Sequence, residues 1–283
     1  MKKFDVWQKT VFRSGSLSGI GLHTGEPCSL KVSPGLKSSG LVFFKNGVKL
    51  GSLSKNEVPI AEAARCTILG EPPDQILTTE HFLAAVWCLG ITNLRVDVEG
   101  PEIPGLDGSA VGFVRFLKNL SLRKQNSKKP MWRLKDPIFC HDSGKAIHAF
   151  PVEEDVLSVA YVLDYDHPAL KNKVVDFDVD PVTFEKEIAP ARTFCTQEEA
   201  RSLKKLGFGR GADFTNTLVM SKHGPVRNRL RFKEECARHK ALDLLGDLSL
   251  LGFGLSARIV GIRSGHTLNR KLVEEIRRQK GDE

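Results

Sequence analysis

The chain has 283 residues, of which 41% are hydrophobic and 27% are charged, and its formal net charge at pH 7 is +8. This length favours about two domains, and the hydrophobic content is sufficient for buried cores, which excludes a disordered chain. No apolar run approaches the roughly 18 residues of a membrane-spanning helix, and the Met1–Asp5 start lacks the apolar stretch of a signal peptide. We therefore expect a cytoplasmic protein without a transmembrane segment.

The six cysteines are scattered along the chain without any C-x-x-C spacing. In a reducing compartment such cysteines are usually small buried apolar residues, so we expect no disulfides. The positive charge would suit nucleic acid, an anionic membrane surface or a small anionic ligand such as a nucleotide diphosphate. Much of the excess lies in Arg123–Lys135 and in Arg270–Lys280, where solvated charge on a linker and on a terminal helix is the simpler explanation.

The first half of the chain begins with a glycine-rich loop and short β-like segments. Gly19–Gly25 (G-I-G-L-H-T-G) places His23 among three glycines, and such a tight backbone could approach a ligand closely or simply turn between strands. The elements predicted after it are a strand at Leu41–Phe44 with a turn at Lys45–Gly47, a helix at His81–Leu89 ended by Gly90, a strand at Thr92–Val98 and a helix at Ala110–Leu120.

A boundary between two halves is predicted in the basic stretch Ser121–Pro130, which is polar, free of periodicity and closed by a proline. The second half repeats the order of elements of the first. Its predicted elements are a strand at Leu157–Val162, a helix running to about Leu251 and ended by Gly252, a strand at Ala257–Ile262 and a helix at Thr267–Arg278. The repeated order predicts an α+β fold built from duplicated units.

Two segments have the residues of a metal site. Thr78–His81 (T-T-E-H) opens the first predicted helix, and His239 and Asp243 lie four residues apart inside another helix. At about 100° per residue the side chains of His239 and Asp243 are roughly 40° apart, so both project from one face, which Asp247 extends. With His81 they would form the two-histidine, one-carboxylate set with which catalytic zinc holds a water molecule. Glu80 would then be the base for that water.

Other readings of these residues stay open at this point. H-x-x-x-D is a short pattern, and an ordinary amphipathic helix with a solvated polar face would also contain it. His266 is predicted at the junction of the last strand and the last helix, where a histidine is either a working side chain or a helix cap.

Taken together, the segments resemble one family, the UDP-3-O-acyl-N-acetylglucosamine deacetylases. The resemblance is collinear and covers nearly the whole chain. The matching segments are G-I-G-L-H-T-G (19–25), T-T-E-H (78–81), I-T-N-L-R-V-D-V-E-G-P-E-I-P-G-L-D-G-S (91–109), A-R-T-F-C (191–195), N-T-L-V (216–219), R-H-K-A-L-D-L-L-G-D-L (238–248) and S-G-H-T-L-N-R-K-L-V (264–273). The resemblance implies zinc-dependent hydrolysis of the N-acetyl group of UDP-3-O-(3-hydroxyacyl)-N-acetylglucosamine, the committed step of lipid A biosynthesis, which releases acetate.

The resemblance also implies roles for individual residues. One zinc ion per chain would be held by His81, His239 and Asp243, with Glu80 as general base. His266, partnered by Asp247, would protonate the leaving amine or stabilise charge, and Thr193 would lie beside the oxyanion. The implied substrate-contacting residues are Leu22, His23, Phe194, Lys240 and Gly211.

The fold implied by the resemblance has two similar domains, 1–125 and 131–283. Each is a β-sheet layered with two helices, with the helices packed inside between the sheets and an insert at about 192–219 that would form a passage for the acyl chain. The implied partner is a UDP-linked acylated amino sugar, and we expect a monomer that touches a membrane surface at most transiently.

One segment departs from the family pattern. Ala63–Leu69 matches weakly, with Arg65 and Cys66 where some members have a histidine, so substrate contacts at this edge are left open. Two alternatives also stay open: a zinc amidohydrolase for another acylated sugar nucleotide, and a basic nucleic-acid-binding protein. For the latter the chain lacks a C2H2 spacing, an aromatic RNP-like strand and a dense basic helix.

Overall fold

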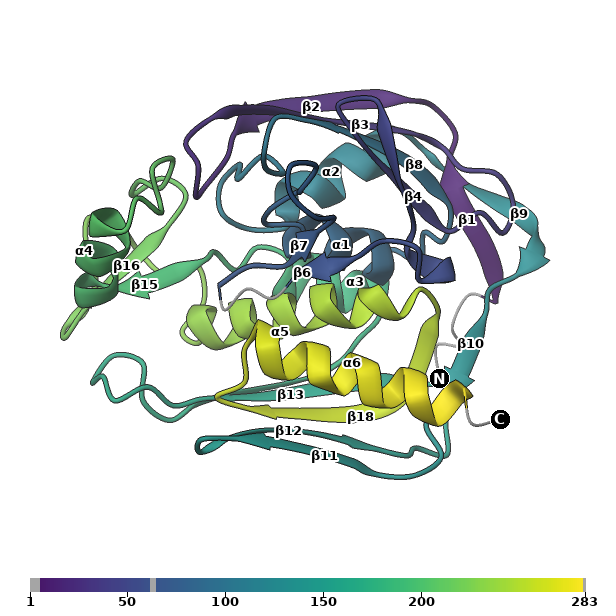
Figure 1. The fold of residues 1–283 in the computed structure, drawn as a ribbon. Helices are drawn as coiled ribbons and strands as arrows, with labels where there is room; N and C mark the ends of the chain where they lie inside the picture. Colours follow the sequence, from purple (N-terminus) through teal and green to yellow (C-terminus); the bar gives the residue numbers. More distant parts are fainter. Residues whose placement is uncertain (1–5, 62–64, 282–283) are drawn as a thin grey trace.

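The computed structural model describes residues 6–61 and 65–281 of the chain. The Met1–Asp5 start, on which the expectation about a signal peptide depends, lies outside the described residues. Within the described ranges, no helix combines the length and the apolar composition that crossing a membrane requires. The fold is mixed α+β, with several sheets and with helices lying between two of them (Figure 1).

The first main sheet has five strands in the spatial order β2-β3-β8-β4-β5. They are β2 (Gly15–Ile20), β3 (Pro27–Pro34), β4 (Leu41–Lys45), β5 (Val48–Ser52) and β8 (Leu94–Glu99). Neighbouring strands are antiparallel except for the parallel pair β8 and β4. In β8 the alternate residues Leu94, Val96 and Val98 are buried, and they belong to the same hydrophobic core as residues of the helices α1 (Glu80–Cys88) and α2 (Val111–Asn119).

The second main sheet repeats this arrangement in the order β11-β12-β18-β13-β14, with β10 also paired to β18. Its strands are β10 (Met131–Arg133), β11 (Ile138–Asp142), β12 (Lys145–Phe150), β13 (Leu157–Leu163), β14 (Lys173–Asp178) and β18 (Gly254–Ile262). Along this order only β18 and β13 are parallel neighbours. Helices α5 (Glu235–Leu248) and α6 (His266–Gly281) pack on it. Strand order and strand directions are therefore the same in the two sheets.

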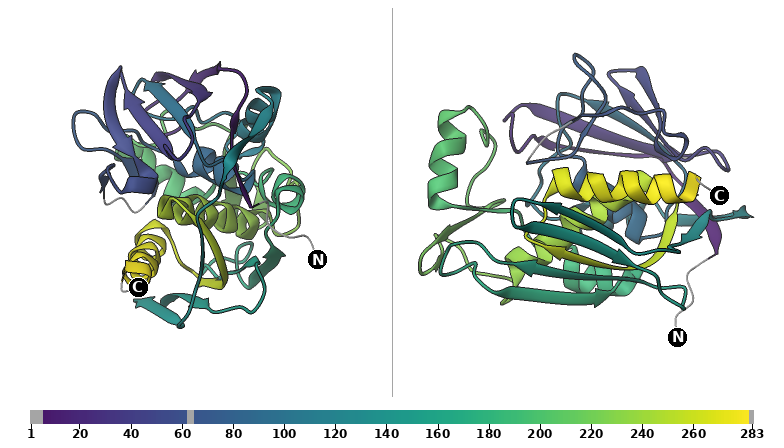
Figure 2. Two further views of the ribbon diagram at one scale, coloured as in Figure 1. Left: turned by 90° about the vertical axis from the view of Figure 1, so that its right-hand side faces the viewer. Right: turned by 60° about the horizontal axis from the view of Figure 1, so that its bottom comes forward.

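The remaining elements are short. They are β1 (Trp7–Val11), β6 (Ile60–Ala61), β7 (Ile68–Leu69), β9 (Leu122–Lys128), α3 (Pro181–Thr183), β15 (Phe194–Thr196), α4 (Gln197–Lys205), β16 (Leu218–Ser221), β17 (Gly224–Pro225) and the single turns η1 (Leu53–Lys55), η2 (Phe184–Ile188) and η3 (Ser249–Leu251). Strands β15, β16 and β17 form a separate sheet. This sheet and α4 together are here called the α4 lobe (residues 194–225), which stands at one end of the molecule (Figures 1 and 2). The predicted insert at 192–219 lies mostly in this lobe.

The predicted helices and strands of both halves are present, but the stretch Ser121–Pro130, in which the sequence predicted a boundary and no regular element, contains a strand. Most of that stretch is strand β9, which pairs antiparallel with β1. None of its side chains is buried, and the stretch is almost entirely polar, so no apolar periodicity marks it as a strand. Long-range backbone pairing with β1, which the local sequence does not show, determines its structure.

The two halves meet where α1 lies against α5, in the layer between the sheets (Figure 1). Gly246 of α5 is a point of close approach, because a Cβ atom added there would lie 2.3 Å from the backbone oxygen of Glu80 in α1. The helices can therefore approach this closely only if position 246 has no side chain. All six cysteines of the chain are free and buried.

We predict that Gly246→Ala destabilises the protein by about 1–3 kcal/mol, because the added methyl group must displace the backbone of α1. Alanine favours a helix by roughly 1 kcal/mol over glycine, so a loss of stability would show that the helix contact dominates. Chemical denaturation measures the free energy of unfolding. Gly281→Ala is the control, since this glycine also belongs to a helix, α6 (His266–Gly281), and a Cβ atom there meets nothing within 4 Å. Equal stability of the two variants would contradict this account of the helix contact.

Candidate active site

The three predicted metal ligands lie together although they come from two helices. His81 is the second residue of α1, and His239 and Asp243 lie one turn apart on α5. One donor atom from each lies within 4.8 Å of the others, and all three residues are buried. The Asp243 Oδ1 atom is 3.3 Å from His239 Nε2 and 3.7 Å from His81 Nε2. The two imidazole nitrogens therefore face the same carboxylate oxygen.

The spacing and the protonation of these donors fit a zinc ion. Ligands about 2.0–2.1 Å from a tetrahedral zinc ion are roughly 3.3–3.4 Å apart, close to the distances found here. Burial lowers the pKa of His239 to about 4, so this ring is neutral at pH 7, as a ligand must be. Burial also lowers the pKa of His81, but the adjacent carboxylates of Asp243 and Glu80 outweigh burial and raise it. Protons and a metal ion therefore compete for His81.

Further contacts fix the orientation of the ligands. His239 Nδ1 lies 3.1 Å from the Ala191 carbonyl oxygen, to which it donates when Nε2 is the free donor towards the metal position. Asp243 Oδ2 accepts a hydrogen bond of 2.7 Å from Lys240 Nζ, which leaves Oδ1 for the metal. Burial raises the pKa of Asp243, but positive charge outweighs burial and holds this pKa well below its ordinary value. The charge comes from His239, which is protonated only at the low pH where Asp243 would titrate, and from Lys240. The carboxylate is therefore ionised.

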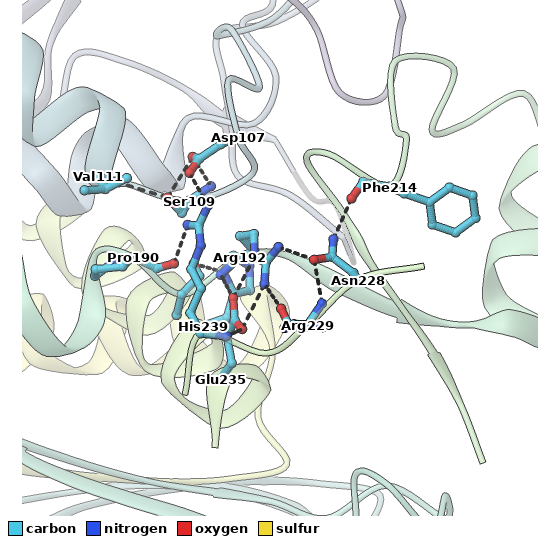
Figure 3. A network of polar contacts seen from close by, with 12 residues as sticks. Asp107, Ser109, Val111, Pro190, Arg192, Phe214, Asn228, Arg229, Glu235 and His239 are labelled. Carbon is cyan, nitrogen blue, oxygen red and sulfur yellow. Dashed lines mark hydrogen bonds and ion pairs between the residues drawn. The ribbon is translucent and has the colours of Figure 1, made fainter. Parts of the chain in front are cut away.

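A buried ion pair holds the segment that contains the Ala191 carbonyl. Arg192 Nε donates to Glu235 Oε1 at 2.8 Å, and both side chains are almost fully buried. Arg192 also donates to the side chain of Asn228 and to the backbone oxygen of Arg229 (Figure 3). Because Glu235 is the first residue of α5, the pair ties the 191–193 segment to the helix that supplies His239. It thereby also holds Thr193 at the site.

Glu80 is held beside the metal ligands by a residue that the sequence did not single out. Thr67 donates its backbone N–H to Glu80 Oε2 at 2.9 Å, and its hydroxyl donates to Asp247. Burial raises the pKa of Glu80, while the nearby positive charge of His266 opposes that shift. A carboxylate with a raised pKa is suited to accept a proton near neutral pH.

His266 and Asp247 form the predicted pair. His266 is the first residue of α6, and its Nδ1 lies 2.9 Å from Asp247 Oδ2, which also accepts 2.8 Å from Asn269 Nδ2. The opposite ring nitrogen, Nε2, is 4.0 Å from Glu80 Oε1. Burial lowers the pKa of His266, but the charge of Asp247 and its hydrogen bond outweigh burial and raise the pKa to about 9. The imidazole is therefore a cation at pH 7.

The glycine-rich loop is anchored to the same region by Glu102, which is completely buried. Its carboxylate accepts from the backbone N–H groups of His23 and Thr24 and, at 2.7 Å, from the Thr78 hydroxyl. A Cβ atom at Gly21 would lie 2.4 Å from a carboxylate oxygen of Glu102, so glycine is required there. Glu102 therefore links the loop to the start of α1.

These groups lie in a cavity of about 700 Å³ between the loop around His23 and the α4 lobe. Most of the predicted site residues line it, namely Leu22, His23, Glu80, His81, Thr193, Phe194, His239, Asp243 and His266. Asp247 lies behind His266. Lys240 and Gly211 are not among the lining residues. Lys240 donates a hydrogen bond to Asp243, and Gly211 donates its N–H to the Leu22 carbonyl. Their roles as substrate contacts stay predictions.

The weakly matching edge of the site is partly outside the described residues, since these begin again at Arg65. Arg65 lines the cavity, and Cys66 is buried, which raises the pKa of its thiol to about 12. Thr67, Asn269 and Arg192 were missed as positioning residues. Asn269 follows His266 by three residues on α6, so helical spacing could have indicated it, whereas no local pattern marks Thr67.

Comparison with known proteins agrees with this geometry. The family model of UDP-3-O-acyl N-acetylglycosamine deacetylase matches residues 8–278. Three UDP-3-O-acyl-N-acetylglucosamine deacetylases are similar to the chain. The protein of Thermodesulfovibrio yellowstonii is 33% identical over 272 residues, which cover 95% of this chain and 92% of that protein. The protein of Wolinella succinogenes is 34% identical over 272 residues, covering 95% and 90%. The protein of Blochmanniella floridana is 35% identical over 277 residues, covering 96% and 92%. The chain therefore belongs to the UDP-3-O-acyl-N-acetylglucosamine deacetylase family.

Proposed function

We propose that the chain removes the N-acetyl group of UDP-3-O-(3-hydroxyacyl)-N-acetylglucosamine by zinc-dependent hydrolysis, the committed step of lipid A biosynthesis. Family membership supports the reaction class. The observation that carries the assignment is the convergence of His81, His239 and Asp243 beside Glu80 and His266 in one cavity. Two neutral nitrogen donors and one carboxylate are the ligand set of a catalytic zinc site. The products are acetate and the free 2-amino sugar nucleotide.

A zinc ion held by these residues would lower the pKa of a water molecule towards neutrality and polarise the amide carbonyl. Glu80, whose carboxylate lies next to the metal ligands, accepts a proton from the attacking water. The Thr193 hydroxyl and the His266 cation face the same cavity and stabilise the negative charge that develops on the carbonyl oxygen. Glu80 or His266 then gives a proton to the leaving nitrogen, because an unprotonated amine is a poor leaving group.

The rest of the cavity suits an acylated ligand. Its wall on the side of the α4 lobe is mainly apolar and includes Phe194, Leu203, Phe208, Phe214 and Val219. We assign this wall to the acyl chain and the loop around Leu22 and His23 to the sugar nucleotide. The volume of about 700 Å³ lies within the range typical of small-molecule sites.

We further propose that the two main sheets with their helices are duplicated domains, 1–125 and 131–283. Their identical strand orders and directions support this, as does the equivalent position of α1 and α5 in the chain order. The site then lies between the domains, with ligands from both. The buried free cysteines are compatible with a reducing cytoplasm as the place of action.

The first prediction concerns the metal. His239→Ala should lower bound zinc and deacetylase activity together, because three protein ligands leave little redundancy. Metal analysis of the purified protein and an acetate-release assay on the UDP-sugar measure both. His223→Ala, at an exposed turn of the α4 lobe, should change neither. Stoichiometric zinc in the His239→Ala protein would contradict the ligand assignment.

The second prediction separates the base from the ligands. Glu80→Gln should keep its zinc yet lose about 10²- to 10⁴-fold in kcat, the usual contribution of a general base. Asp243→Asn should lose both zinc and activity. A Glu80→Gln enzyme with near wild-type kcat would show that another group accepts the proton.

The third prediction concerns pH. If the His266 cation is required, activity falls as pH rises through its pKa of about 9. Asp247→Asn removes the charge that raises this pKa, so burial lowers it and the alkaline limb moves to lower pH. Asn269→Ala keeps the carboxylate and should move the limb much less. The profiles of kcat/KM against pH measure this, with zinc content as a control. Superimposable profiles for Asp247→Asn and wild type would refute the pairing.

A further inference from the structure

The α4 lobe exposes apolar side chains at the rim of the cavity. Leu206 is 73% exposed, Phe208 is 47% exposed and Phe214 is 36% exposed. Phe208 and Phe214 also line the cavity, whereas Leu206 is not among its lining residues. The lobe stands at one end of the molecule, apart from the two main sheets (Figures 1 and 2). Exposed apolar side chains grouped at a cavity mouth indicate contact with an apolar partner.

The same rim is positively charged. From Ala200 to Ala212 the chain has four basic residues and no acidic one, and all four are exposed. They are Arg201, Lys204, Lys205 and Arg210. Just before this stretch, Glu199 is engaged in the capping box of α4 with Thr196 and lies 3.7 Å from Arg65. The exposed acidic residues Glu198 and Asp213 adjoin this stretch, so the whole α4 lobe has a net charge of +2. The rim therefore combines exposed apolar side chains with four exposed basic side chains on a lobe of net positive charge.

We propose that this rim docks on an anionic membrane surface, with Leu206 and Phe208 entering the interface and the basic side chains facing lipid phosphates. Apolar insertion and a polybasic segment are the two signals that together give stable but reversible binding. Each basic side chain near such a surface strengthens binding about fivefold. A nucleic acid would attract the same charges, but Leu206 would contribute little to binding it.

The rim lies at the mouth of the cavity, so docking would place the cavity next to the bilayer. The role that we assign to the docking rests on the proposed function. The apolar wall of the cavity runs to the rim through Leu203, Phe208 and Phe214. A ligand whose acyl chain lies along this wall could pass between the cavity and the bilayer without exposing the chain to water. The lobe would thus bring the cavity mouth to the surface where an acylated product can partition.

Vesicle flotation tests the docking directly. The full chain should bind vesicles of phosphatidylcholine containing roughly a quarter phosphatidylglycerol, should not bind pure phosphatidylcholine, and should be released by salt. The double variant Lys205→Gln/Leu206→Gln should weaken binding about tenfold or more, because it removes one charge and the most exposed apolar side chain.

The chain offers a matched control, an exposed leucine and lysine pair outside the α4 lobe. Leu36 is 82% exposed and is followed by the exposed Lys37, far from the α4 lobe in sequence. Leu36→Gln/Lys37→Gln should bind vesicles like wild type. Failure of the wild type to bind anionic vesicles would overturn the proposal. Equal losses in the two double variants would do so too, as would displacement by duplex DNA with no effect of Leu206→Gln.

The test is independent of the catalytic assignment. Neither Lys205 nor Leu206 lines the cavity, so their double variant should deacetylate a short-acyl substrate in solution within about twofold of wild type. Vesicle binding without deacetylation would overturn the proposed function and leave the docking surface. Deacetylation without vesicle binding would overturn the docking surface and leave the proposed function.

Discussion

The close contact of α1 and α5 is the constraint on which the site depends. His81 and Glu80 belong to the first turn of α1, and the other two ligands belong to α5. Gly246 lets the backbones of the two helices come together at Glu80 itself, so the contact and the site share a residue. A site assembled in this way exists only when both halves are folded and packed, because neither helix holds a complete ligand set.

Around this contact, buried polar groups orient the reacting groups. Two of the ligands and the base each have a partner that holds the side chain: Ala191 for His239, Lys240 for Asp243 and Thr67 for Glu80. Burying so many polar groups is costly unless they are paired, and the pairing also limits their motion. The result is a preorganised site in which the pKa values of Glu80 and His266 are both raised, the first by burial and the second by Asp247.

The sequence predicted the order of the main helices and strands, and the three residues that it predicted as metal ligands lie together in the structure. Helical periodicity placed His239, Asp243 and Asp247 on one face, and the family resemblance connected them to His81. Prediction from the local sequence failed where contacts between residues far apart in the chain determine the structure. Strand β9 forms because β1 pairs with it. Arg192 positions the 191–193 segment because it forms an ion pair with Glu235, which is distant in the sequence. Thr67 similarly acts on residues of α1 and α5, which no local pattern reveals.

X-ray absorption at the zinc edge of the purified protein would test the central claim most directly. The account predicts a first shell of only nitrogen and oxygen at about 2.0–2.2 Å, with two imidazoles, and no sulfur. This result would hold although six cysteines are present, because all six are buried thiols outside the ligand set. A zinc–sulfur distance of about 2.3 Å, or a shell with a single imidazole, would contradict it.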